Sequence, residues 1–218
     1  MILYEDNHLL VVQKPVNVPV QADESGDEDL LTLLKQDIKV RYNKPGNVYL
    51  GLVHRLDRPV GGAMVFAKTS KAASRLSDTL RKHEMERVYF AVVRGVPEAK
   101  DKLVHHLYKD QTKNKVFVVP AHDKRGKKAI LHYERVATSG DLSLIKVQLE
   151  TGRSHQIRVQ FATMGWPLYG DQKYGQHVNQ KGQQIALWST TIAFPHPTTK
   201  EQLSFQCAPP QTLPWSLF

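Results

Sequence analysis

The order of the apolar segments restricts the fold more than any other feature of this chain. Three successive stretches between residues 100 and 150 favour strands, namely KVFVVP (115–120), KKAILHYERVA (127–137) and LSLIKVQLE (142–150). Further strand-like runs lie at 8–15, 47–53, 62–70, 86–95, 184–197 and 201–207, and helical stripes at 29–42, 70–84 and 154–165. Because this order is neither a regular strand–helix alternation nor all strand, the sequence predicts an α+β fold. We expect a large, mixed, mainly antiparallel sheet flanked by helices.

The charge balance favours a polyanionic partner. The 218 residues include 30 Lys and Arg against 21 Asp and Glu, a net charge of +9. Such a surplus favours nucleic acid first and an anionic membrane second, although an indifferent basic surface has the same composition. Five of the acids lie in the run 23–29, which we interpret as a solvated loop before a helix, so the remainder is more basic still.

The remaining composition predicts a cytoplasmic protein that uses no membrane and no metal. The single Cys207 cannot form an internal disulfide, which fits a reducing compartment. No signal pattern precedes the first apolar run, and no stretch approaches the length of a membrane span. His105 and His106 have no cysteine or carboxylate at metal-ligand spacing, so zinc is not expected.

The stretch VHRLDRPVGG, residues 53–62, places Asp57 on a turn directly after a strand. A carboxylate that caps the turn is the structural alternative for this residue. His54, Arg55 and Arg58 are potential cations that would hold Asp57 ionised, and arginine can also stack on a base or grip a phosphate. The two glycines that follow leave room for a bulky group to approach the backbone. These features favour a functional carboxylate.

A second polar cluster lies in LETGRSHQIRVQFATMG, residues 149–165. Arg153, His155 and Gln156 place donors at the start of a predicted helix, where an anion would dock. Arg158 lies one turn further, at the edge of a buried stripe, and an arginine there is costly unless it is paired. An exposed helix arginine is the alternative. We expect a buried acid partner, and Asp57 is the acid predicted for it.

Three ordered motifs resemble the signature regions of the RluA family of RNA pseudouridine synthases. They are VHRLDRP, MERVYFAVVRG and LETGRSHQIRVQFATMGWPLYGD, preceded by ILYEDNHLLVVQKPVNVPV, which resembles the opening strands of that family. The resemblance runs from about residue 1 to about residue 205. From its pattern alone, Tyr89 in the second motif is a core aromatic.

The resemblance implies an enzyme that detaches uracil from its ribose, turns it and rejoins it through carbon, without cofactor or metal. Asp57 matches the essential aspartate of the family, Tyr89 its active-site tyrosine and Arg158 the basic residue that pairs with the aspartate. An ionised carboxylate near the sugar can act as nucleophile or stabilise positive charge. Arg55 matches the arginine that helps to fill the place of a flipped uridine. The predicted RNA contacts are therefore His54, Arg55, Arg58, Arg153, His155 and Gln156.

The chain departs from the family pattern at Gly61, where relatives carry serine or threonine, and at Arg87, where they carry lysine. We expect residues 1–218 to form a single, monomeric catalytic domain without a separate N-terminal RNA-binding domain. RNA selection would then depend on this domain, including the basic segments 109–115 and 122–128, whose alternative role is a solvated turn. Family habit slightly favours ribosomal over transfer RNA as substrate. The alternative function is a non-catalytic RNA-binding ribosome-assembly factor with the same basic cleft.

Overall fold

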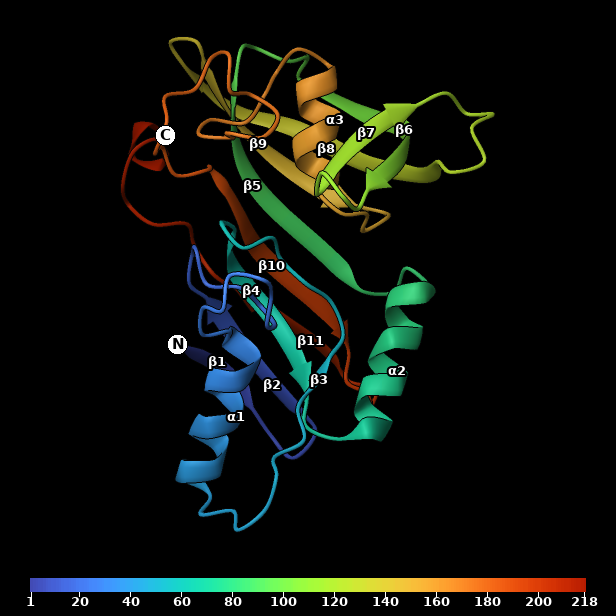
Figure 1. Cartoon of the computed structure of the whole chain (residues 1–218), viewed down its shortest axis with the longest axis vertical. Coiled ribbons are helices and arrows are strands. Elements are labelled where there is room, and N and C mark those ends of the chain that lie inside the picture. The colour runs from blue at the N-terminus through green and yellow to red at the C-terminus, as the bar shows by residue number, and fades with distance from the viewer. The chain divides into compact units, whose positions relative to one another are not determined.

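The computed structural model describes all 218 residues, which form two compact units. Unit 1 comprises Met1–Arg87 and Ser189–Ala208, and unit 2 comprises Val88–Trp188 and Pro209–Phe218 (Figure 1). Two strands, β5 (Glu86–Arg94) and β10 (Leu187–Pro195), contribute residues to both units. The expectation of one catalytic domain stays a prediction.

Unit 1 is built on a sheet in which β2 pairs antiparallel with both β1 and β4. Its strand order is β1–β2–β4–β10, with β3 paired to β4 and β11 to β10. The strands are β1 (Ile2–Glu5), β2 (Leu9–Lys14), β3 (Gly51–Leu52), β4 (Gly61–Ala67) and β11 (Gln202–Gln206). Every residue of β4 is buried, so its apolar run is continuous rather than alternating.

Two amphipathic helices belong to unit 1, α1 (Leu30–Arg41) and α2 (Ser70–Arg81). Asp29 at the end of the acidic run caps α1 by accepting the backbone N–H of Thr32, and Thr69 caps α2 by accepting that of Ala72. Each helix buries one stripe of residues three to four positions apart, as the sequence predicts.

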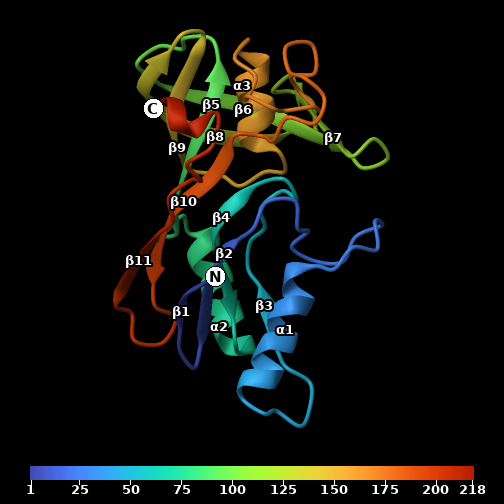
Figure 2. The same cartoon turned by 90° about the vertical axis from the view of Figure 1, so that its left-hand side faces the viewer.

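Unit 2 is a five-stranded antiparallel sheet in the order β5–β9–β8–β6–β7. Its strands besides β5 are β6 (Lys100–Asp110), β7 (Lys115–Val119), β8 (Lys127–Ser139) and β9 (Leu142–Leu149). Helix α3 (Gln156–Thr163) lies against β6 and β7 (Figure 2), and a short 3-10 turn, η1 (Trp215–Leu217), ends the chain. On the face that α3 covers, the ring of Phe161 lies 5.3 Å from that of Tyr133.

The predicted α+β class with a mixed, mainly antiparallel sheet is confirmed. The helix expected over 154–165 is shorter, because His155 has a left-handed φ of 49° and the helix begins only at Gln156. The strand expected over 47–53 is reduced to Gly51–Leu52. No helix is long and apolar enough to cross a membrane.

Candidate active site

Asp57 lies on a tight turn between β3 and β4. The backbone N–H of Val60 donates to the carbonyl oxygen of Asp57 at 2.9 Å. Leu56 and Val60 are buried on either side, whereas Asp57 is partly exposed. The turn is thus anchored by its buried apolar neighbours, while Asp57 is only partly buried.

The second glycine after this turn, Gly62, does not leave room for a ligand, contrary to the expectation from sequence. Gly61 and Gly62 belong to β4, and Gly62 has a φ of 115°. A Cβ atom at Gly62 would lie 2.2 Å from the carbonyl oxygen of Ser189 in β10. The glycine is required because a neighbouring strand occupies the space.

Lys14, at the end of β2, is completely buried and supports the Asp57 turn through hydrogen bonds. Its Nζ donates to the carbonyl oxygens of Pro15 at 2.9 Å, Arg58 at 2.9 Å and Val60 at 2.8 Å. All three ammonium donors are therefore used, two of them by the turn itself. Burial lowers the pKa of Lys14 to about 8, while the charge of Asp57 opposes that shift. The sequence suggested only a strand end here.

His54 is held as a neutral ring. Its Nε2 accepts the backbone N–H of Val65 in β4 at 3.1 Å. Burial, and next the charge of Arg87, lower the pKa of His54 to about 3. His54 therefore supplies no positive charge near Asp57 at neutral pH, contrary to the expectation from sequence. Its predicted contact with RNA stays a prediction.

This neutral histidine predicts a loss of stability in acid. The unfolded chain titrates near 6.5, so the contribution of His54 is complete above about pH 6.5 and is lost as the pH falls towards about 3. We expect the free energy of unfolding, measured with denaturant between about pH 7 and about pH 4, to fall more steeply in the wild type than in His54→Gln. The glutamine amide can accept the same N–H without titrating. If the free energy of unfolding depended on pH equally in the wild type and in His54→Gln, the assignment of His54 as a buried neutral group would be wrong.

The two arginines that flank Asp57 in sequence differ in their surroundings. Arg55 is exposed and has no hydrogen-bond partner, so it is available to RNA. Arg58 donates to the carbonyl oxygen of Asn17 at 3.2 Å, to Oγ of Ser25 at 3.0 Å and to the carboxylate of Asp27. A phosphate that bound Arg58 would have to replace a carboxylate of the acidic loop. Exposed pairs of this kind contribute little stability.

In unit 2, Tyr89 and Arg158 lie on the same face of the sheet. Tyr89 in β5 pairs with Val147 in β9, which pairs with Tyr133 in β8. Directly opposed residues of antiparallel strands point to one face, and Tyr133 packs against Phe161 of α3. By this register the buried Tyr89 faces the side of the sheet that α3, the helix of Arg158, covers.

Arg158 has a buried acid partner, as expected, but it is an acid that the sequence did not single out. Nε of Arg158 donates to Oδ2 of Asp171 at 2.8 Å, and Nη2 donates to Oδ1 at 2.9 Å. Burial raises the pKa of the Asp171 carboxyl, but the hydrogen bond and charge of Arg158 outweigh it, and the pKa is lowered. The predicted pairing of Arg158 with Asp57 joins residues of different units and stays a prediction. The motif quoted above ends at Asp171, which was the available signal.

The loop before α3 is organised by Gln156, whose side chain is buried. Its Oε1 accepts from the hydroxyl of Thr151 at 2.8 Å and from the backbone N–H of Arg153 at 2.9 Å. Its Nε2 donates to the carbonyl oxygen of Ile130 at 3.0 Å. Gln156 therefore shapes the loop that presents the exposed Arg153, while the RNA contacts predicted for both residues stay predictions.

His155, also predicted to contact RNA, is hydrogen-bonded to a tyrosine. Its Nδ1 lies 2.7 Å from the hydroxyl of Tyr174, which accepts the backbone N–H of Val116 in β7 at 2.8 Å. The left-handed backbone of His155 turns the chain into α3. The structure thus connects the third motif to β7, which was not foreseen.

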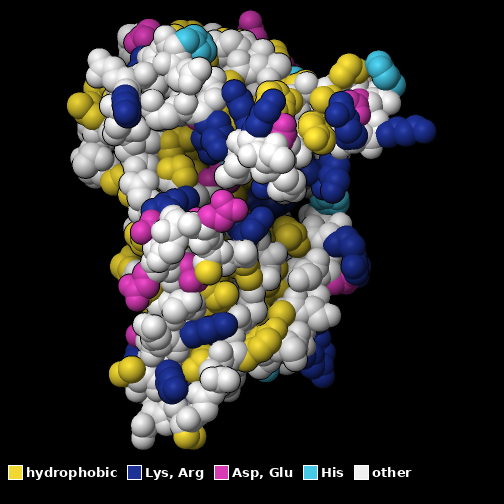
Figure 3. All heavy atoms as spheres, viewed as in Figure 1, with side chains coloured by type: hydrophobic (Ala, Val, Ile, Leu, Met, Phe, Trp, Pro, Cys, Tyr) yellow, Lys and Arg dark blue, Asp and Glu magenta, His cyan; other side chains and the backbone are white.

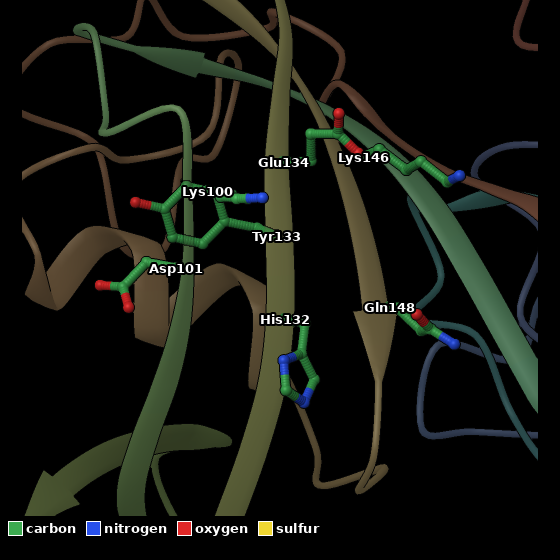
Figure 4. Close-up of a pocket in the computed structure, with 7 residues that line it drawn as sticks. All are labelled: Lys100, Asp101, His132, Tyr133, Glu134, Lys146 and Gln148. Atoms are coloured by element: carbon green, nitrogen blue, oxygen red, sulfur yellow. The ribbon is translucent and has the colours of Figure 1, made fainter.

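A separate hollow of about 380 Å³ lies over β6, β8 and β9 (Figure 4). It is lined by Lys100, Asp101, His132, Tyr133, Glu134, Lys146 and Gln148. Two lysines and two carboxylates balance one another, so the hollow has no preference for a phosphate. None of the predicted site residues lines it, and we do not place the substrate there.

The comparisons with known proteins decide the family. The family model described as RNA pseudouridylate synthase matches residues 8–163, more than half of the chain. The chain belongs to the RNA pseudouridylate synthase family. The resemblance to the RluA family is therefore confirmed, and with it membership of a family of isomerases.

Named relatives are similar over nearly the whole chain. Ribosomal large subunit pseudouridine synthase D of Zymomonas mobilis is 33% identical over 97% of this chain and 70% of its own length. Ribosomal large subunit pseudouridine synthase C of Buchnera aphidicola is 32% identical over 90% of this chain and 63% of its own. The chain thus spans about two thirds of the length of these relatives.

A solved structure shares the fold. Human RNA pseudouridylate synthase domain containing 4 superimposes with a TM-score of 0.82 at 22% identity, covering 99% of this chain and 91% of that one. At this identity the likeness establishes the fold of the family for this chain.

Proposed function

We propose that this chain isomerises uridine to pseudouridine in RNA, with Asp57 as the catalytic carboxylate. The observation that carries the proposal is the Asp57 turn, which the buried Lys14 holds through two carbonyl oxygens while Asp57 itself is only partly buried. In the reaction the bond between N1 of uracil and C1′ of ribose breaks and a bond between carbon 5 and C1′ forms. N1 gains a proton, and carbon 5 loses one to solvent. Asp57 serves as nucleophile at C1′ or stabilises the positive charge that develops there.

The other proposed roles follow from the chemistry of each side chain and from the family resemblance. Arg158 supplies the positive charge that keeps a catalytic carboxylate ionised when RNA excludes water, and Tyr89 packs on the base or takes part in proton removal. Arg55, exposed and unpaired, takes the place of the uridine that leaves the stack. The protein acts as a cytoplasmic monomer and needs no cofactor or metal.

Ribosomal RNA is the substrate we propose, because two relatives carry the name ribosomal large subunit pseudouridine synthase. The test is the release of tritium from RNA labelled at carbon 5 of uridine, with ribosomal and transfer RNA transcripts assayed separately. Release from ribosomal RNA supports the proposal. Release from transfer RNA alone would show that transfer RNA, and not ribosomal RNA, is the substrate. RNA binding without release from either would favour the non-catalytic assembly factor.

A basic hairpin in unit 2 supports RNA as the partner. Residues 109–128, from the end of β6 to the start of β8, carry seven Lys and Arg against two Asp. Figure 3 shows Lys and Arg side chains gathered over this hairpin, at the upper right. Phosphate contacts made by such residues release counterions, so binding depends on salt.

We expect RNA affinity to fall about 10³-fold between low and physiological salt if about six phosphates are contacted. Replacing the exposed Lys124 and Lys127 by Gln should reduce the slope of log affinity against log salt by about one to two units. The exposed lysines Lys39 and Lys44 of unit 1, replaced in the same way, are the matched control. A slope that is unchanged in the hairpin variant would exclude the hairpin from the interface.

A further inference from the structure

We propose that Asp171 and Tyr174 are positioning residues: Asp171 orients Arg158, and Tyr174 ties the same turn to strand β7 of the basic hairpin. The inference rests on the proposed function, in which Arg158 is a catalytic residue. All the residues that carry it belong to unit 2.

Asp171 holds the guanidinium of Arg158 in one orientation. The two residues share two parallel hydrogen bonds, of 2.8 and 2.9 Å, and both are buried. A bidentate pair fixes the plane of the guanidinium as well as its position. An arginine held by a single bond could rotate about its side-chain torsions, whereas the two bonds to Asp171 hold the Arg158 guanidinium in one plane.

The carboxylate of Asp171 is itself held by the backbone. Its Oδ1 accepts the N–H groups of Lys173 at 2.9 Å and Tyr174 at 3.1 Å. The N–H of Gly175 donates to the Asp171 carbonyl oxygen at 3.0 Å. Asp171 therefore closes the turn 171–175, and the position of Arg158 depends on the position of that turn.

The same turn is joined to the basic hairpin by three groups. The Tyr174 hydroxyl accepts the N–H of Val116 at 2.8 Å, and Nζ of Lys173 donates to the carbonyl oxygen of Asn114 at 2.6 Å. Two cations lie over the ring of Tyr174, with Cζ of Arg158 at 5.3 Å and Nζ of Lys115 at 5.8 Å from its centroid. One aromatic ring thus contacts both the proposed catalytic arginine and a lysine of the RNA-binding hairpin.

These contacts predict different kinetic consequences for the two side chains. Asp171→Asn keeps the volume but loses one acceptor for Arg158, so kcat should fall about 100-fold, the scale of a small misplacement at a reacting centre. The KM for RNA should change less than about threefold. Tyr174→Phe keeps the ring against Arg158 but releases Val116 and His155, so it should raise KM up to about tenfold and leave kcat within about threefold.

The experiment measures single-turnover rate and RNA affinity by tritium release for both variants. Asp141→Asn and Tyr169→Phe are the matched controls, because Asp141 is an exposed acid beside Arg94 and the Tyr169 hydroxyl accepts from Gln183. Thermal unfolding is recorded for each protein. If Asp171→Asn does not fold, Asp171→Glu replaces it, with a smaller loss of kcat expected because the carboxylate is kept but displaced.

A double-mutant cycle with Arg158→Met separates positioning from general damage. If Asp171 acts through Arg158, Asp171→Asn lowers kcat only when Arg158 is present and has no further effect in Arg158→Met. An equal loss in both backgrounds, or a wild-type kcat in Asp171→Asn, would overturn the inference. A wild-type protein that releases no tritium from any RNA would instead refute the proposed function.

Discussion

Asp57→Asn is expected to lower the rate of tritium release by at least about 10⁴-fold, the scale seen when a central catalytic group is removed. The amide has nearly the same shape as the carboxylate, but it carries no charge and is a poor nucleophile. The backbone hydrogen bond that closes the turn uses the carbonyl oxygen of Asp57, so the turn itself should be preserved. Affinity for the RNA substrate should therefore stay within about threefold of wild type.

The measurement pairs tritium release with equilibrium RNA binding on the same preparations. Asp37→Asn on helix α1 is the control, because Asp37 is an exposed acid that pairs only with Arg41. If binding falls in parallel with the rate in Asp57→Asn, the carboxylate has a structural role and the catalytic assignment is wrong.

Lys14→Met is expected to reduce both stability and activity. Methionine is apolar and similar in length, but it leaves three carbonyl oxygens without their donor, at one buried and two partly buried hydrogen bonds. Each such loss costs about 1–3 kcal/mol, partly offset because the ammonium no longer has to be buried, so we expect a net loss of about 3 kcal/mol. Two of those carbonyls belong to the Asp57 turn, whose displacement should lower the rate about 100-fold.

The measurements are denaturant unfolding and tritium release at a temperature where the variant is folded. Lys68→Met is the matched control in the same unit, since Nζ of Lys68 bonds a carboxylate of Glu5 and the carbonyl oxygen of Asp6 instead. It should lose stability without a comparable loss of rate in the folded protein. Equal rates for the two folded variants would show that Lys14 only supports folding.

The helices and most strands could be predicted because their signals are local. Helix α1, expected over 29–42, spans Leu30–Arg41. Its apolar stripe and the cap residue Asp29 that precedes it both lie in the segment for which a helix was expected. The role of Gly62 could not be predicted in the same way. The strand that fills the space beside it contains Ser189, far away in the sequence.

In the candidate site, too, local features could be predicted and contacts between distant segments could not. The local motif identified Asp57 as a carboxylate on a tight turn, and the position of Arg158 beside a buried stripe required an acid partner. The sequence did not indicate that Asp171 is a partner of Arg158, because several acids could have paired with this arginine. Nor could it identify Lys14 as the brace of the turn, since the carbonyls it meets are 44 and 46 residues away.

The sequence by itself determined the family, the α+β class and the residues proposed for the chemistry, because ordered motifs and local periodicity carry that information. Only the tertiary structure decided which of those groups are charged and what holds them. His54 looks like a cation beside Asp57 in sequence, yet its burial and its bond to Val65 keep it neutral. Burial and hydrogen bonds between distant segments arise only on folding, and they set the pKa and orientation of each side chain.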